Sequence, residues 1–109
     1  MADSQDRAKF FRDLGRMVVN LSDEGYNFMP FSFYRTKAEQ EVLVSQGKSK
    51  TMDSKHCEWL ACDLVFLQNG GLVWTRVKAY EIAGKMWEDM GHTWGGRWES
   101  LNDIYHFEF

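Results

Sequence analysis

The sequence predicts an α+β fold in which helices pack on a small antiparallel sheet. Three segments have helical character and four have strand character, in the order helix, strand, helix, hairpin, helix, strand. The pair Asn69-Gly70 is a strong signal for a tight hairpin between two antiparallel strands. Helices and antiparallel strands that follow one another in this way along a chain are typical of the α+β class.

Three segments are expected to be helical, and each is followed by a glycine that can end it. Residues 5–24 carry apolar side chains at spacings of three and four, which place them on one face of a helix. Thr36 and Glu39 form a T-x-x-E capping box, which predicts the start of a second helix that runs to about residue 46. Residues 80–90 form the third predicted helix.

Strand character is expected in four segments. In the aromatic stretch 26–34, Pro30 prevents a helix, and we expect a strand over the second half of that stretch. Residues 59–67 and 72–77 flank the asparagine–glycine turn and should form the hairpin. The last strand is expected in the short apolar run 105–109. A polar loop with several lysines is expected between the second helix and the hairpin.

Length and composition favour a single domain that covers residues 1–109. The chain has a mass of 12.8 kDa, with 13 Lys+Arg against 16 Asp+Glu and a net charge of -3. Domains that bind nucleic acid through phosphate contacts are usually basic, so no nucleic-acid partner is expected. No apolar run approaches the roughly 20 residues of a membrane span, and no secretory signal is recognised. We therefore expect cytoplasmic synthesis without membrane insertion.

Two histidines and two aspartates are candidates for a metal site. Catalytic zinc commonly takes three protein ligands from histidine and carboxylate side chains, which His56, Asp63 and His106 could supply. Asp103 could then act as a general base. Asp63 interrupts an apolar strand, where a carboxylate is costly to bury unless it is paired or bound to a metal. The alternatives for Asp63 are a buried ion pair or a strand edge that faces water. The alternative for each histidine is an ordinary hydrogen-bonded or solvated residue without a metal.

Three separated motifs together resemble one known family. Residues 34–36 read YRT with Gln40 on the next helix, 54–63 read SKHCEWLACD, and 94–98 read WGGRW before DIYHFE at 103–108. These segments resemble, in the same order, the Y-R-[ST]-x-x-x-Q, S-x-H-x-x-G-x-A-x-D and W-G-G-x-W … D-x-x-H-F-E motifs of the zinc D,D-carboxypeptidase and L-alanyl-D-glutamate endopeptidase family. The resemblance implies a zinc domain of the hedgehog/D,D-peptidase type.

The resemblance also implies roles for individual residues. His56, Asp63 and His106 would bind one Zn²⁺ per chain. Asp103 would be the general base, and Arg35 would stabilise the carbonyl oxygen as it gains negative charge. The alternative for Arg35 is a surface ion pair.

Further residues are assigned with structural alternatives. Ser54 and Gln40 are plausible substrate contacts. The alternatives are that Ser54 only forms a turn and that Gln40 lies on the surface of its helix. Glu108 could orient a zinc ligand or face solvent, and Trp98 is expected to be a packing residue. Trp59 stands where the family usually has glycine, a residue that permits unusual backbone angles.

The function implied by this resemblance is hydrolysis of peptide bonds in the stem peptides of bacterial peptidoglycan. An L-alanyl-D-glutamate endopeptidase that acts as a phage or prophage endolysin fits best. Such a monomer would reach the cell wall through a membrane pore and would have no separate wall-binding domain. The alternatives are a D-alanyl-D-alanine carboxypeptidase or dipeptidase, and a zinc-stabilised binding module without catalysis. A purely structural zinc site would need neither Asp103 nor Arg35.

Overall fold

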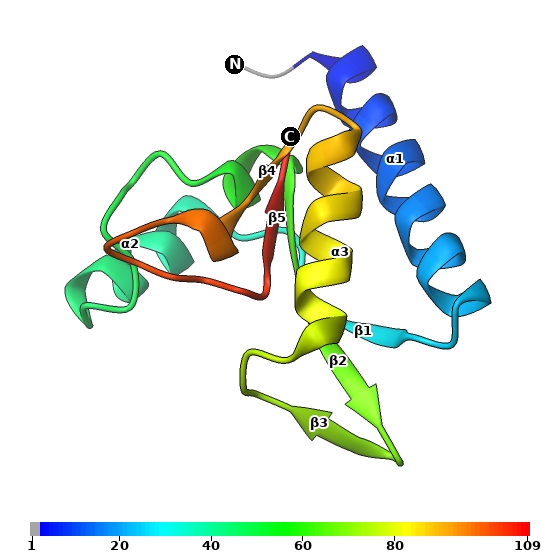
Figure 1. Cartoon of the computed structure of the whole chain (residues 1–109). Coiled ribbons are helices and arrows are strands. Elements are labelled where there is room, and N and C mark those ends of the chain that lie inside the picture. The colour runs from blue at the N-terminus through cyan, green and yellow to red at the C-terminus, as the bar shows by residue number, and fades with distance from the viewer. Residues whose placement is uncertain (1–2) are drawn as a thin grey trace.

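The computed structural model, which describes residues 3–109, has three α-helices around an antiparallel sheet (Figure 1). The α+β architecture predicted from the sequence is therefore confirmed. The helices are α1 (Ser4–Asp23), α2 (Lys37–Ser45) and α3 (Lys78–Asp89), with the short 3-10 helices η1 (Lys55–Glu58) and η2 (Gly95–Arg97). The strands are β1 (Asn27–Ser32), β2 (Ala61–Gln68), β3 (Gly71–Val73), β4 (Thr93–Trp94) and β5 (His106–Glu108).

Strand β2 is the centre of the sheet. Its partners are β1 along one edge, β5 beside its first half and β3 beside its second half, while β4 pairs with the far side of β5. All of these pairs are antiparallel. The register of β2 and β5 places Asp63 directly opposite His106, although the two residues are far apart in the sequence.

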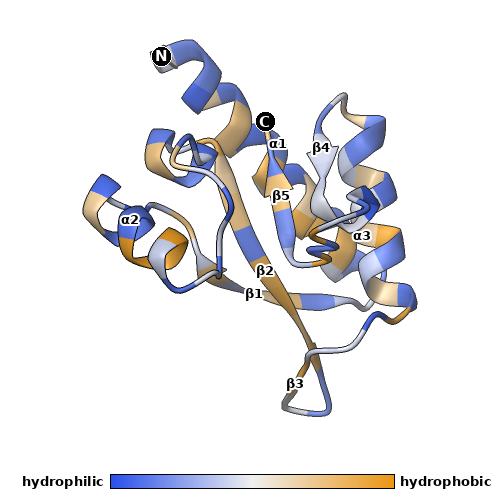
Figure 2. Ribbon diagram, turned by 90° about the vertical axis from the view of Figure 1, so that its left-hand side faces the viewer, coloured by the Kyte–Doolittle hydropathy of each residue, from blue (hydrophilic) through white to orange (hydrophobic). Residues whose placement is uncertain are grey.

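The hydrophobic core lies between the sheet and the helices α1 and α3. Four residues of α1 (Phe10, Leu14, Met17, Leu21) pack with apolar side chains of β2 and α3. The ring of Phe10 meets Trp87 of α3 edge to face, at 5.7 Å between centroids. In Figure 2, β2 is largely orange, which marks it as the apolar strand through the middle of the molecule. Helix α2 lies on the opposite side of the molecule from α1 (Figure 1).

Strand β1 begins earlier than the sequence indicated. We expected the strand in the second half of residues 26–34, but it covers Asn27–Ser32. Pro30 lies inside it because β1 pairs only with β2, so one side of its backbone needs no ladder hydrogen bond. The register also shifts between Pro30 and Ser32, which marks an irregularity where the strand ends.

The remaining elements match the sequence prediction closely, and the predicted hairpin turn is present. Three differences concern the length of β3, the helix η1, and the pair β4 and η2. Asn69 and Gly70 both have positive φ, 53° and 78°, as a two-residue type I′ turn requires. Strand β3 is only three residues long, so residues 74–77 are not strand. The end of the predicted loop is η1, and the predicted turn after α3 holds β4 and η2. Within residues 3–109, no helix is both long and apolar enough to cross a membrane.

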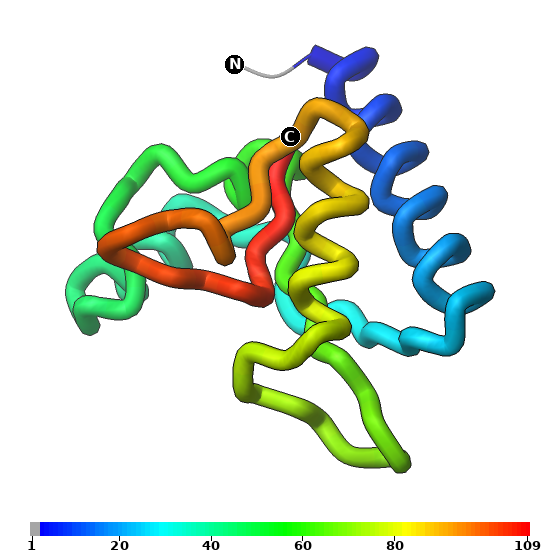
Figure 3. Tube along the Cα trace, in the orientation of Figure 1, coloured from blue at the N-terminus to red at the C-terminus, as the bar shows by residue number. Residues whose placement is uncertain are grey.

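Two connecting segments lie on the side of the sheet away from α1. The trace in Figure 3 shows the green loop between α2 and η1 and the orange-to-red segment from η2 to β5 on the same side as α2. Residues of both segments line one cleft of about 250 Å³. Helices α1 and α3 thus support the back of the sheet, and the loops build the cleft at its front.

Candidate metal centre

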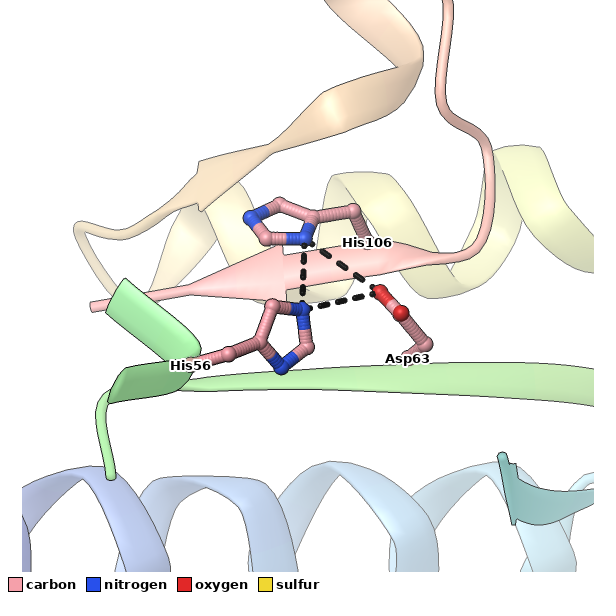
Figure 4. A group of neighbouring side chains, drawn as sticks. All are labelled: His56, Asp63 and His106. Carbon is pink, nitrogen blue, oxygen red and sulfur yellow. Dashed lines mark hydrogen bonds and ion pairs between the residues drawn. The ribbon is translucent and has the colours of Figure 1, made fainter. Parts of the chain in front are cut away.

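Three predicted ligands converge at the junction of β2 and β5. Asp63 and His106 are cross-strand partners, and His56 comes from η1, which directly precedes β2. The hydroxyl of Ser54 caps η1 by accepting a hydrogen bond from the His56 backbone N–H at 3.2 Å. Figure 4 shows the three side chains pointing toward one another. Strand register therefore brings Asp63 and His106 together, and a capped turn adds His56.

The distances within this cluster match the spacing of metal ligands. His56 Nε2 lies 3.3 Å from His106 Nδ1 and 3.4 Å from Asp63 Oδ1, and the latter two atoms are 3.3 Å apart. Nitrogen and oxygen ligands about 2.0–2.1 Å from a tetrahedral ion stand about 3.3–3.4 Å from one another. The three residues therefore fit one metal ion without rearrangement.

Outer hydrogen bonds decide which ring nitrogens face the centre. His56 Nδ1 lies 2.8 Å from the carbonyl oxygen of Phe33, which can only accept, so this nitrogen carries the proton. His106 Nε2 lies 2.8 Å from Glu108 Oε1 and donates to that carboxylate. In the neutral imidazoles the inner nitrogens are therefore left with lone pairs, the arrangement that outer-shell partners commonly impose on metal-binding histidines. Glu108 thus holds the imidazole of His106 in place and does not simply face solvent.

The electrostatics of the cluster favour positive charge at its centre. Burial alone would raise the pKa of Asp63, but its contacts with the imidazoles of His106 and His56 outweigh it and lower that pKa to about 2. Burial would lower the pKa of His106, but its hydrogen bonds to Asp63 and Glu108 raise it to about 9, so a metal ion at Nδ1 would replace the second proton of the imidazolium. Asp63 is therefore a carboxylate at neutral pH, as a metal ligand must be.

Asp103 lines the same cleft but is not one of the clustered donors. Its Oδ1 accepts a hydrogen bond from the backbone N–H of Tyr105 at 3.3 Å. Burial, reinforced by the charge of Asp63, raises its pKa, which suits a group that must accept a proton. A Cβ at Gly95 would lie 2.5 Å from the Asp103 carbonyl oxygen, so glycine is required there for the Asp103 segment to approach.

Arg35 reaches the cleft from the segment between β1 and α2. Its backbone N–H donates to the His56 carbonyl oxygen at 3.1 Å, which joins this segment to η1. The guanidinium donates to Gln40 Oε1 at 2.8 Å, and its Nη2 lies 3.7 Å from Asp63 Oδ2. The side chain is 15% exposed, so the cation lies beside the ligand cluster and still borders the cleft.

Gln40 has a different position from the one its predicted role requires. We expected a substrate contact, but the side chain is fully buried, at 0% exposure. Its amide oxygen accepts from Arg35, and its amide nitrogen donates to Ser49 Oγ at 2.8 Å and to the Thr51 carbonyl oxygen at 2.6 Å. Gln40 therefore positions Arg35 and the cleft loop, and has no donor left for a substrate.

Ser54 and Trp98 both line the cleft. Ser54 caps η1 and also borders the cleft, and its contact with a substrate stays a prediction. Trp98 was expected to be a packing residue, but its ring lies beside that of His106, at 5.0 Å between centroids. Its neighbour Trp94 is fully buried, and the indole N–H of Trp94 donates to the Ile104 carbonyl oxygen. The WGGRW motif thus supplies one core indole and one cleft indole, which spacing alone could not separate.

Trp59 adopts the backbone conformation that a glycine would take. Its φ of 62° and ψ of 31° are left-handed, and it ends η1. Its indole stacks on the ring of Tyr34, with centroids 4.4 Å apart and planes 13° apart. Trp59 lines a separate apolar pocket with Phe33 and α1, so it does not narrow the cleft.

Comparison with known proteins places this site in a recognised family. Residues 47–109 match the peptidase M15 family described as D-alanyl-D-alanine carboxypeptidase. This matched region includes all three clustered donors and Asp103.

Two relatives have related descriptions. The chain is 29% identical over 98 residues to the L-alanyl-D-glutamate peptidase of Listeria phage A118; the match covers 86% of the chain and 34% of the phage protein. The chain thus spans about a third of that relative's length. The crystal structure of Serratia marcescens L-Ala D-Glu endopeptidase ChiX superposes with a TM-score of 0.70 at 26% identity, covering 96% of this chain and 78% of the other.

Proposed function

The chain belongs to the peptidase M15 family, and from this premise we propose that it is a zinc metallopeptidase that hydrolyses stem peptides of bacterial peptidoglycan. The observation that carries the proposal is the cluster of His56 Nε2, Asp63 Oδ1 and His106 Nδ1, spaced as metal ligands and bordered by Asp103 and Arg35 in one cleft. Two imidazoles and one carboxylate are a common ligand set of catalytic zinc, which leaves a position for water or substrate.

The bond between L-alanine and D-glutamate is the proposed site of cleavage. The support is that both relatives, one matched by sequence and one by structure, carry names that specify this bond. The phage origin of one of them supports an endolysin role, in which the protein is made in the cytoplasm and reaches the wall through a membrane pore. We propose that the chain acts as a monomer and a single catalytic domain.

The proposed chemistry divides among the residues of the cleft. A zinc ion held by the three ligands would polarise the scissile carbonyl and lower the pKa of a water molecule toward about 7. Asp103 would accept a proton from the attacking water and return it to the leaving amine. The Arg35 guanidinium would donate to the carbonyl oxygen as negative charge develops there. Gln40 would hold Arg35 in place from behind.

A D-alanyl-D-alanine carboxypeptidase activity is the second candidate, favoured by the description of the matched family. The two activities require the same metal site and differ in the bond that lies over it. The third reading, a binding module without catalysis, is disfavoured because Asp103 and Arg35 both border the cleft, where a structural ion would need neither.

Mass spectrometry of digested peptidoglycan distinguishes these functions. Purified sacculi are incubated with the metal-loaded protein, with a matched His56→Ala sample as control. New L-alanine carboxyl termini and D-glutamate amino termini would confirm the proposed bond, whereas release of free D-alanine would identify the carboxypeptidase. If neither product forms while the protein still sediments with the sacculi, the binding module is correct and the peptidase proposal fails.

A further inference from the structure

The cleft contains two cations for which the proposed chemistry has no role. Lys48 and Lys50 lie in the loop between α2 and η1, and both line the cleft that holds the ligand cluster. Within residues 3–109, neither lysine forms a salt bridge. Both are exposed, so their ammonium groups are available to a ligand.

The other basic groups of the cleft already have partners. Lys55 Nζ lies 3.7 Å from Glu108 Oε2, and the Arg35 guanidinium lies 3.7 Å from Asp63 Oδ2. Asp53, at the end of the same loop, lines the cleft without a salt bridge to either free lysine. The loop therefore contributes positive charge that the described part of the chain does not neutralise.

The backbone that carries these lysines is anchored. The buried amide of Gln40 donates to Ser49 Oγ and to the Thr51 carbonyl oxygen, the residues on either side of Lys50. The backbone N–H of Lys48 donates to the end of α2 at 2.9 Å. A loop that is already ordered loses less entropy when its side chains bind a ligand, so this anchoring favours binding.

We propose that Lys48 and Lys50 form a carboxylate subsite for the part of the stem peptide that follows the scissile bond, an inference that rests on the proposed function. Stem peptides link D-glutamate to the next residue through its side-chain carboxyl group, which leaves the α-carboxylate free beside the scissile nitrogen. Where the third residue is diaminopimelate, a second free carboxylate follows. No acidic group precedes the bond, so the lysines also set the direction in which the peptide lies.

The subsite should act on substrate binding and not on turnover. The carboxylate is charged in the bound substrate and in the transition state alike, so its contact with lysine stabilises both equally. Loss of the contact raises KM and leaves kcat close to its original value. A single charge-assisted hydrogen bond in a cleft open to water corresponds to roughly a tenfold effect.

Matched peptides test the proposal. The reference contains L-alanine, γ-linked D-glutamate with a free α-carboxylate, and diaminopimelate. One analogue carries an α-carboxamide in place of the α-carboxylate, and the other has lysine in place of diaminopimelate, which removes only the second carboxylate. The wild type should hydrolyse the reference with a higher kcat/KM than at least one analogue, and the analogue whose KM is raised identifies the carboxylate bound. This ratio of kcat/KM values is the preference for the reference, and Lys48→Ala/Lys50→Ala should bring it close to one.

Control variants separate charge from structural damage. Lys48→Arg/Lys50→Arg keeps both charges and should keep the preference. Lys78→Ala/Lys85→Ala removes two charges from α3, outside the cleft, and should leave the preference unchanged. A preference that survives in Lys48→Ala/Lys50→Ala, or a loss confined to kcat, overturns the subsite.

Binding measurements keep the two proposals distinguishable. Calorimetric titration of the same peptides into Asp103→Asn reports affinity without hydrolysis. If the wild type cleaves none of the peptides but binding still prefers the reference and depends on the two lysines, the proposed reaction fails and the subsite stands. Equal binding of all three peptides overturns the subsite, whatever the activity.

Discussion

Three carboxylates of the cleft differ in their proposed roles because each contacts different atoms. Asp63 points an oxygen at both inner imidazole nitrogens, Glu108 accepts from the outer nitrogen of His106, and Asp103 accepts from the backbone N–H of Tyr105. The proposed roles of ligand, orienting group and base thus fall to three carboxylates with different contacts. The hydrogen-bond partner of each carboxylate, more than its distance along the chain, separates these roles.

Removal of one imidazole should abolish metal binding. His56→Ala deletes one of three donors, and the two that remain are too few to hold the ion at micromolar metal concentrations. Elemental analysis should find less than about a tenth of the wild-type metal, and peptidase activity should be lost with it. His92→Ala is the control, because the His92 side chain is also buried but lies outside the cluster, so this variant loses a buried imidazole without losing a proposed ligand. Full metal content in His56→Ala would refute the assignment.

The proposed base should be separable from the metal. Asp103→Asn keeps the size of the side chain and the hydrogen bond from Tyr105, but an amide cannot accept the proton of the attacking water. We expect kcat to fall roughly 10²–10⁴-fold with metal content unchanged. A near-native rate would exclude Asp103 as the base, and loss of metal would make it a ligand.

Arg35 should act on turnover more than on binding. Arg35→Ala should lower kcat roughly 10²–10³-fold, the scale of one oxyanion donor, with metal content and unfolding midpoint close to wild type. Arg35→Lys keeps the charge but loses the planar pair of donors and should stay impaired. If instead Arg35→Ala lowers the unfolding midpoint while the folded fraction works normally, Arg35 is only an ion-pair partner of Asp63.

At the scale of the elements, the short helix η1 places the proposed ligand His56 beside β2. Ser54 caps its beginning, and Trp59 ends it in a left-handed conformation that turns the chain into the strand. A residue with a Cβ is strained in that conformation, and the stacking of the indole on Tyr34 offsets the strain. The family glycine would avoid the strain but would lose the stacking.

Two substitutions at Trp59 separate these effects. Both Trp59→Ala and Trp59→Gly lose the indole, but only alanine keeps the left-handed strain. Trp59→Gly should therefore be more stable than Trp59→Ala by roughly 1 kcal/mol in urea unfolding. At Glu41, in the exposed middle of α2, the order should reverse, with glycine about 1 kcal/mol less stable than alanine. If alanine were more stable than glycine at both positions, no strain would reside at Trp59.

At the scale of the whole molecule, a buried contact between a carboxylate and an imidazole joins the first helix to the turn after the third. Asp13 of α1 accepts from Lys9 and lies 2.8 Å from His92 Nε2, with both the Asp13 and the His92 side chains almost fully buried. The imidazole of His92 also lies against the ring of Trp87. This contact fixes α1 against the end of α3, behind the sheet that carries the metal cluster.

The Asp13 pair should make the fold sensitive to acid. Burial opposes ionisation, but hydrogen bonds from Lys9 and His92 outweigh it and lower the pKa of Asp13 below its usual 3.8. A lowered folded-state pKa stabilises the protein above the unfolded value, and this stabilisation is lost as the pH falls through the folded value. Asp13→Asn should therefore be about 1–3 kcal/mol less stable than wild type at pH 7.

The difference in free energy of unfolding between wild type and Asp13→Asn, here called the gap, should shrink below about pH 4, where the wild-type carboxyl takes up a proton. Urea unfolding at pH 7 and pH 3 measures it in both proteins, and other acid effects cancel in the comparison. Asp23→Asn, an exposed position at the end of α1, should show no gap at either pH. A gap of equal size at both pH values would exclude an electrostatic origin.

The local signals of the sequence determined most of the elements and the chemical identity of the site. Helical spacing, the Thr36 capping box and the Asn69-Gly70 turn depend on neighbouring residues, so their structural consequences could be predicted without the fold. The motifs likewise identified His56, Asp63 and His106 as a group, because a motif consists only of residue types and their order, and both can be read directly from the sequence. Strand β1 was misplaced because only pairing with β2 decides where an edge strand begins.

Tertiary structure alone decided which atoms meet. The β2–β5 register, set by packing of both strands on α1 and α3, brings Asp63 to His106, and contacts with Phe33 and Glu108 select the inner nitrogens. Gln40 was predicted to face a substrate but is buried, because Arg35 and the cleft loop use its whole amide. Such contacts join residues that are distant along the chain. Their positions depend on burial and strand pairing, which local spacing does not specify.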